Sequence, residues 1–90
     1  MYRVFVRHEV EDFDKWHEGY RKYYPIQVDL NMCGDAVHRD QENGNKITVA
    51  HDFATMDDVK RYMGLPNLKE LMDKIGVKSQ PDIWVTKRVL

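Results

Sequence analysis

The sequence is poor in the features that mark several classes of protein. It has one cysteine, Cys33, in 90 residues, so no internal disulfide can form, and this favours the reducing cytoplasm. The N-terminal segment MYRVFVRHEV interrupts its apolar residues with charges. That pattern argues against both a signal peptide and a membrane span. The length allows one hydrophobic core, so we expect residues 1–90 to form a single domain.

An excess of charge of either sign is also missing. Fourteen basic and 15 acidic residues are mixed along the chain and leave a net charge of -1. The basic residues form no continuous stripe that could bind a phosphate backbone. We therefore do not expect nucleic acid as a partner. The single cysteine likewise excludes a copper chaperone with a Cys-x-x-Cys motif.

Four segments show the two-residue periodicity of strands. They are residues 2–10, 35–40, 46–53 and 82–89, with residues 31–34 expected as a loop. In the first segment Val4, Val6 and His8 share one face, while Phe5 and Arg7 share the other. Residues 42–45, which contain Asn-Gly, are typical of a hairpin turn because both residues tolerate a positive φ.

Helical spacing predicts three further segments. Asp12 is a suitable N-cap for a helix that Pro25 should end. Thr55 to Asp58 resembles a capping box, and Gly64 should close the helix that it starts. A last helix is expected from Pro66 to Gly76. The apolar faces of the three helices consist of Phe13, Trp16, Tyr20 and Tyr23; of Val59, Tyr62 and Met63; and of Leu68, Leu71, Met72 and Ile75.

The order β-α-β-β-α-β predicts an α+β, ferredoxin-like fold. We expect a four-stranded antiparallel sheet in which, as an exception, the first and third strands form a central parallel pair. Both helices should cover one face. Phe5 and Trp84 fall on the other face beside small residues, and a second copy of the chain is the simplest cover for them. The sequence therefore predicts a homodimer.

Two histidines end the apolar stretches VFVRH and TVAHDF at positions where alternation predicts inward side chains. If the two strands run parallel, His8 and His51 lie close together. Burial would keep both imidazoles neutral, as a base that removes a proton next to a carbonyl requires. The alternative is a structural pair at the edge of the core. A metal site is disfavoured, because Glu9 and Asp52 alternate to the opposite face.

Aromatic residues gather around the two histidines in this prediction. We expect a substrate pocket shaped by Trp16, Tyr20, Phe53 and Tyr62, in which a tyrosine hydroxyl holds a developing oxyanion. The alternative is that these side chains only fill the core, as aromatic residues at helical spacing often do.

Three stretches resemble one protein family. They are VRHEVEDFDKW from Val6, GDAVHRDQENGNKITVAHDF from Gly34 and LPNLKELMDKIGV from Leu65. Together they are similar to the dimeric α+β barrel superfamily, which includes antibiotic-biosynthesis monooxygenases and small stress-responsive proteins. The resemblance implies two four-stranded sheets that join into a barrel across the dimer. It also implies one pocket between each sheet and its helices.

The resemblance does not extend to the heme-degrading members. Their Asn, Trp and His positions hold His8, Phe53 and Met72 here, and without the axial histidine heme chemistry is disfavoured. We therefore expect a cytoplasmic homodimer that binds a small aromatic or carbonyl compound. As an enzyme it would be a cyclase, isomerase or monooxygenase that needs no cofactor, with His8 and His51 as proton-transfer groups. The alternative is a non-enzymatic binding or stress-response protein.

Overall fold

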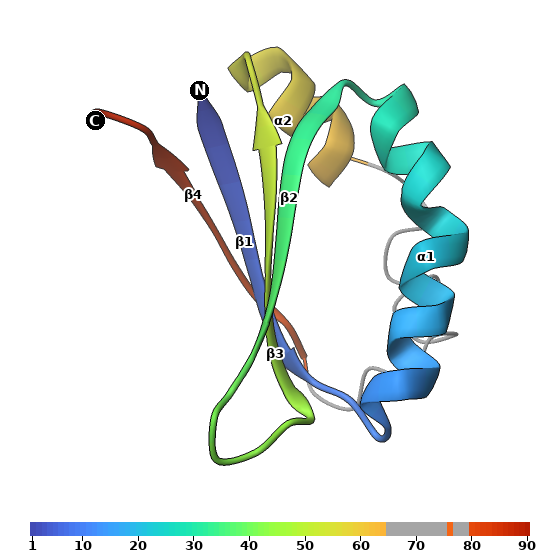
Figure 1. The fold of residues 1–90 in the computed structure, drawn as a ribbon. Helices are drawn as coiled ribbons and strands as arrows, with labels where there is room; N and C mark the ends of the chain where they lie inside the picture. Colours follow the sequence, from blue (N-terminus) through green and yellow to red (C-terminus); the bar gives the residue numbers. More distant parts are fainter. Residues whose placement is uncertain (65–75, 77–79) are drawn as a thin grey trace.

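One sheet carries two helices on the same face, in the order that the sequence predicts (Figure 1). The structure is a computed structural model and describes residues 1–64, 76 and 80–90. Its elements are β1 (Tyr2–Glu9), α1 (Phe13–Asp29), β2 (Met32–Arg39), β3 (Lys46–Phe53), α2 (Met56–Met63) and β4 (Asp82–Lys87). The helix predicted from Pro66 lies, except for Gly76, outside the described residues.

The sheet has the strand order β2-β3-β1-β4, and each neighbouring pair is antiparallel. The predicted parallel pairing of β1 with β3 is therefore wrong. The connection through α1 makes β1 and β2 parallel, but it leaves a gap of one strand between them. A hairpin turns the chain back after β2, and β3 fills that gap antiparallel to both of its neighbours.

Side chains on β1 alternate between the two faces of the sheet, as predicted. Val4, Val6 and His8 are buried on the helix side, where they join the core. Phe5 and Arg7 point to the face that carries no helix, which we call the open face. This alternation fixes which residues a ligand on either side can contact.

The first helix begins as predicted but runs further. The Oδ1 atom of Asp12 accepts hydrogen bonds from the backbone N–H groups of Asp14 and Lys15. The helix then continues through Pro25 to Asp29, so the end predicted there is wrong. Arg21 and Pro25 are both exposed. Water can therefore reach the Arg21 carbonyl that the proline leaves without an N–H partner, and the helix tolerates the loss.

The second strand starts earlier than predicted because a single residue turns the chain. Asn31 has a φ of 68°, and its amide donates a 3.0 Å hydrogen bond to Asp58 at the start of α2. The strand begins at the next residue, Met32, where a loop was expected. Cys33 is an extra residue in the pairing, because the register with β3 shifts between Met32 and Gly34.

The predicted hairpin joins β2 to β3, but hydrogen bonds from the backbone to side chains of the loop hold it in place. Asp40 Oδ1 accepts from the N–H groups of Glu42 and Asn43, and Asn43 Oδ1 accepts from that of Asn45. Gly44 does not supply the positive φ that we expected. In residues 1–64, 76 and 80–90, only Asn31 and Gly76 have a positive φ. Local side-chain acceptors therefore replace the tight turn.

Two smaller details of the prediction need correction, one in α2 and one in β4. The helix α2 is capped by the Thr55 side chain, which accepts from Asp58 N–H as expected, but Met63 is exposed and does not join the apolar face. The last strand ends at Lys87, and Val89 beyond it is exposed. Neither change affects the helix side of the sheet.

We predict that Asn31→Ala lowers the free energy of unfolding by about 2 kcal/mol, because it strains the left-handed backbone and removes the hydrogen bond to Asp58. Asn31→Gly should cost about half as much, since glycine adopts this φ without strain. Urea denaturation of both variants measures the difference. Equal stabilities of the two variants would show that backbone strain at this position is negligible.

Candidate functional site

A row of aromatic rings lies between the sheet and the helices. Successive ring centroids are 5.1–6.0 Å apart. The order along the row is Phe13, Trp16, Tyr20, His51, Tyr62 and Phe53. The row includes the four aromatic residues that the sequence predicts for a pocket. They come from α1, β3 and α2, which the fold brings together over one face of the sheet.

The two predicted histidines share this face but do not meet. His8 lies opposite Ile47, whereas His51 lies opposite Val4. Because His51 is four residues beyond Ile47 on β3, the two sites are about 14 Å apart along the strands. The predicted close pair is therefore wrong, since it required parallel strands. Each histidine must be judged by its own surroundings.

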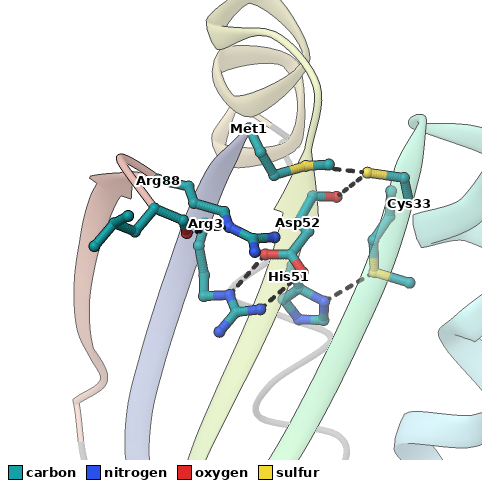
Figure 2. Close-up of polar contacts among 8 residues, drawn as sticks. Met1, Arg3, Cys33, His51, Asp52 and Arg88 are labelled. Carbon is teal, nitrogen blue, oxygen red and sulfur yellow. Dashed lines mark hydrogen bonds and ion pairs between the residues drawn. The ribbon is translucent and has the colours of Figure 1, made fainter.

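His51 is held within the core and is only 2% exposed. Its Nδ1 atom lies 3.0 Å from the sulfur of Met32 (Figure 2). A thioether has no proton to give, so this contact favours the tautomer with the proton on Nδ1. Burial lowers the pKa of His51 to about 4, although Asp35 and Asp52 act in the opposite direction. The imidazole is neutral at physiological pH.

The tyrosines on either side of His51 differ in their partners. Tyr20 donates a 3.0 Å hydrogen bond from its hydroxyl to Asp35 on β2. Burial, together with this carboxylate, raises the pKa of Tyr20. Burial raises the pKa of Tyr62 to about 12. Both phenols stay protonated, and the proton of Tyr20 is directed at Asp35 rather than at a ligand.

His8 lies beside the row, against its second ring, Trp16. The two rings meet edge to face, with centroids 5.6 Å apart, and both residues are buried. Burial lowers the pKa of His8, although an interaction of the ring with the residue's own backbone acts in the opposite direction, and the balance favours the neutral form. Within the described part of the chain, His8 Nδ1 and Trp16 Nε1 have no hydrogen-bond partner. Buried nitrogens without partners are uncommon in folded proteins.

The open face has a different character. Phe5 and Trp84 stack on neighbouring strands with centroids 5.2 Å apart, and Trp84 is 38% exposed. Arg3 binds Asp52 through two hydrogen bonds of 2.7 and 3.0 Å, which lower the pKa of that carboxyl. Figure 2 shows Arg88 approaching Asp52 from the side of β4. The face is therefore partly apolar and partly ionic.

Two hollows flank the Phe5–Trp84 stack on this face. One, of about 450 Å³, includes Arg3, Asp52 and Arg88. The other, of about 540 Å³, includes Arg7, His38 and Lys46 and is also bordered by His8. The sequence predicts neither hollow, although it does single out His8, which borders the second one.

Three residues near His51 are not among the predicted site residues: Met32, Cys33 and Asp35. Met32 and Cys33 belong to β2 and not to the loop that the sequence predicts. Cys33 is exposed, and its thiol lies 3.4 Å from the Asp52 carbonyl oxygen and 3.5 Å from the Met1 sulfur (Figure 2). Asp35 pairs with His51 across the strands. The pairing that brings these residues together depends on the bulge at Cys33, which the sequence pattern does not predict.

Across residues 1–64, 76 and 80–90, no three His, Cys, Asp or Glu side chains gather in a way that would hold a metal ion. The helices described here include none that is long and apolar enough to cross a membrane.

The fold is shared with solved structures of very different sequence. A candidate antibiotic biosynthesis monooxygenase from Bordetella bronchiseptica superposes with a TM-score of 0.80 at 17% identity, over 99% of this chain and 97% of its own. SnoaB from Streptomyces nogalater, a cofactor-independent oxygenase, gives 0.74 at 10% identity, over 99% and 95% of the two chains. No family model and no curated protein matches the sequence.

A third structure agrees with these two. A candidate antibiotic biosynthesis monooxygenase from Caulobacter crescentus gives a TM-score of 0.73 at 17% identity, over 99% of this chain and 90% of its own. The ferredoxin-like fold and its likeness to antibiotic-biosynthesis-monooxygenase structures, both predicted from the sequence, are thus confirmed. Identities this low establish the fold alone.

We predict that the protein loses stability as the pH falls from about 6.5 to about 4. The unfolded chain protonates His51 near its ordinary pKa of 6.5, whereas the folded protein resists protonation down to about 4. The unfolded state therefore binds more protons in this range, and the lost stability reaches about 3 kcal/mol. Urea denaturation over this pH range measures it.

The matched variants are His51→Gln, which removes the buried imidazole, and His17→Gln, which removes an exposed one. His51→Gln should be less stable at neutral pH and should depend less on pH. His17→Gln should follow the wild-type curve. The same pH dependence in wild type and His51→Gln would contradict this assignment.

Proposed function

We propose that this chain binds a small aromatic or carbonyl compound on the helix side of its sheet and transfers a proton without a cofactor. The observation that carries the proposal is the row of aromatic rings that includes the buried, neutral His51 and contacts the buried, neutral His8 through Trp16. Aromatic walls suit a flat ligand, and a neutral imidazole is a base near physiological pH. The fold shared with the cofactor-independent oxygenase SnoaB supports this reading.

The separation of the histidines assigns them different roles in the proposal. His8 is the base, because its Nδ1 atom has no partner among the described residues. His51 supports the site, because Met32 engages its Nδ1 and Tyr20 and Tyr62 contact its ring. An enolate formed by His8 is the common first intermediate of cyclisation, of isomerisation and of oxygenation with dioxygen as co-substrate.

A second candidate is binding without catalysis, including a role as a stress-response protein. The surroundings of His51 favour it, because an imidazole enclosed by a thioether and two phenols stabilises the core. In that case His8 contributes a hydrogen bond and no proton transfer. The two candidates differ in whether a bound ketone exchanges its α-protons.

We also propose that the protein is a homodimer joined through the open face. Phe5 and the partly exposed Trp84 form an apolar centre there, and Arg3, Asp52 and Arg7 surround it. A second copy would bury the rings and enclose the two hollows. The exposed, unpaired thiol of Cys33 supports a reducing compartment, the cytoplasm, as the location.

The proposal predicts that wild type accelerates exchange of the α-protons of β-tetralone, an enolisable aromatic ketone, in deuterium oxide. We expect His8→Gln to lower the catalysed rate about a hundredfold, because general base catalysis contributes that much. His51→Gln should retain most of the rate. Proton magnetic resonance follows the exchange. Binding of β-tetralone without exchange would favour the non-enzymatic candidate.

The dimer is tested separately. Trp84→Asp should convert it to a monomer, because it removes the stacked indole from the centre of the interface and requires a charged group to be buried there. Ile26→Asp is the control, since Ile26 is an exposed apolar residue of α1 on the other side of the molecule. Native mass spectrometry gives the oligomeric state. A monomeric wild type, or dissociation by Ile26→Asp alone, would contradict the proposed interface.

A further inference from the structure

Polar atoms without partners are concentrated where His8 meets Trp16. Three buried side-chain atoms in residues 1–64, 76 and 80–90 lack a hydrogen bond: His8 Nδ1, Trp16 Nε1 and Gln27 Oε1. Two of them belong to rings in direct contact. Trp16 is 1% exposed and His8 is 6% exposed, so bulk water does not satisfy them. Each such atom costs about 1–3 kcal/mol, which a ligand can recover.

The chemistry of the two nitrogens is complementary. An indole N–H can only donate, so Trp16 requires an acceptor atom. A neutral imidazole can accept at Nδ1 when its proton is on Nε2. The contact between the rings therefore places one donor and one acceptor on adjacent buried side chains. A carbonyl group next to an acidic C–H bond offers the matching acceptor and proton.

The tyrosines are less suited to the donor role that the sequence suggested for them. Tyr20 already gives its hydroxyl proton to Asp35 at 3.0 Å. Tyr62 packs against His51 and Phe53, at the end of the row away from His8. The indole N–H of Trp16 is the buried donor beside His8 that remains unused within the described structure.

We propose that Trp16 Nε1–H holds the carbonyl oxygen of the ligand while His8 Nδ1 removes the proton from the adjacent carbon. This inference rests on the proposed function and names its oxyanion donor and its ligand class, an enolisable ketone. The C–H bond breaks, and its proton moves to Nδ1. Its electron pair forms a carbon–carbon double bond, and the negative charge settles on the oxygen that Trp16 holds. Return of a proton or deuteron to carbon restores the ketone.

The first test is a proton–nitrogen correlation spectrum, in which the protein has two indole signals, from Trp16 and Trp84. Trp16→Phe assigns the signals. Addition of β-tetralone should shift the Trp16 signal and leave that of Trp84, on the open face, in place. Tetralin has the same ring system without the oxygen, and should leave the Trp16 N–H signal nearly unshifted.

The second test is the exchange of the β-tetralone α-protons by variants. Trp16→Phe keeps an aromatic ring but removes the N–H, and should lower the maximal exchange rate about a hundredfold with little change in KM. Trp84→Phe is the matched control and should exchange at the wild-type rate. If Trp16→Phe does not fold, Trp84→Phe assigns the two signals, and the spectrum of the wild type still decides whether the oxygen is bound.

The outcomes separate this inference from the proposed function. Exchange that is equally fast in wild type and Trp16→Phe, with no selective shift, overturns the role of Trp16 and leaves the proposed function standing. Absence of exchange in wild type removes the catalytic function. In that case a shift with β-tetralone but not with tetralin still supports oxygen binding by Trp16, and no such shift overturns it.

Discussion

The antiparallel pairing of β1 with β3 is the constraint on which the arrangement of this protein depends. It places His8 at one end of the helix side and His51 at the other. The aromatic row then spans the distance between them, with Trp16 beside His8 and Tyr62 beside His51. A single acid–base pair is impossible in this register. The two histidines instead have different surroundings. His8 lies beside an indole N–H that has no partner among the described residues, and His51 is enclosed by core residues.

Burying two imidazoles is costly, and the structure offsets the cost differently at each. His51 has an acceptor for its Nδ1 proton and aromatic neighbours, so its burial contributes to the core as long as it remains neutral. His8 and Trp16 are buried with nitrogens that lack partners within residues 1–64, 76 and 80–90. Natural proteins retain such local costs mainly where they serve a function. This contrast is the physical reason for placing the chemistry at His8.

Most of the fold could be predicted from the periodicity of apolar residues along the chain. The alternation in β1, the cap at Asp12 and the cap at Thr55 all predicted what the structure contains. Pro25 and Asn31 were misread, because an exposed carbonyl tolerates the proline and a left-handed asparagine replaces the expected loop. The helix-side placement of both histidines was predictable from alternation, but their separation was not, since it depends on strand direction. That His8 Nδ1 and Trp16 Nε1 have no partner in the described part of the chain depends on side-chain packing, which a sequence pattern does not express.

The central claim is that a ketone binds on the helix side, at the contact between His8 and Trp16. The most direct measurement is a crystal structure of the protein soaked with bromo-β-tetralone, with the bromine located by its anomalous scattering. The account predicts bromine on the helix side and the carbonyl oxygen within hydrogen-bond distance of Trp16 Nε1. Bromine found only in the open-face hollow beside Arg3 and Arg88 would contradict it.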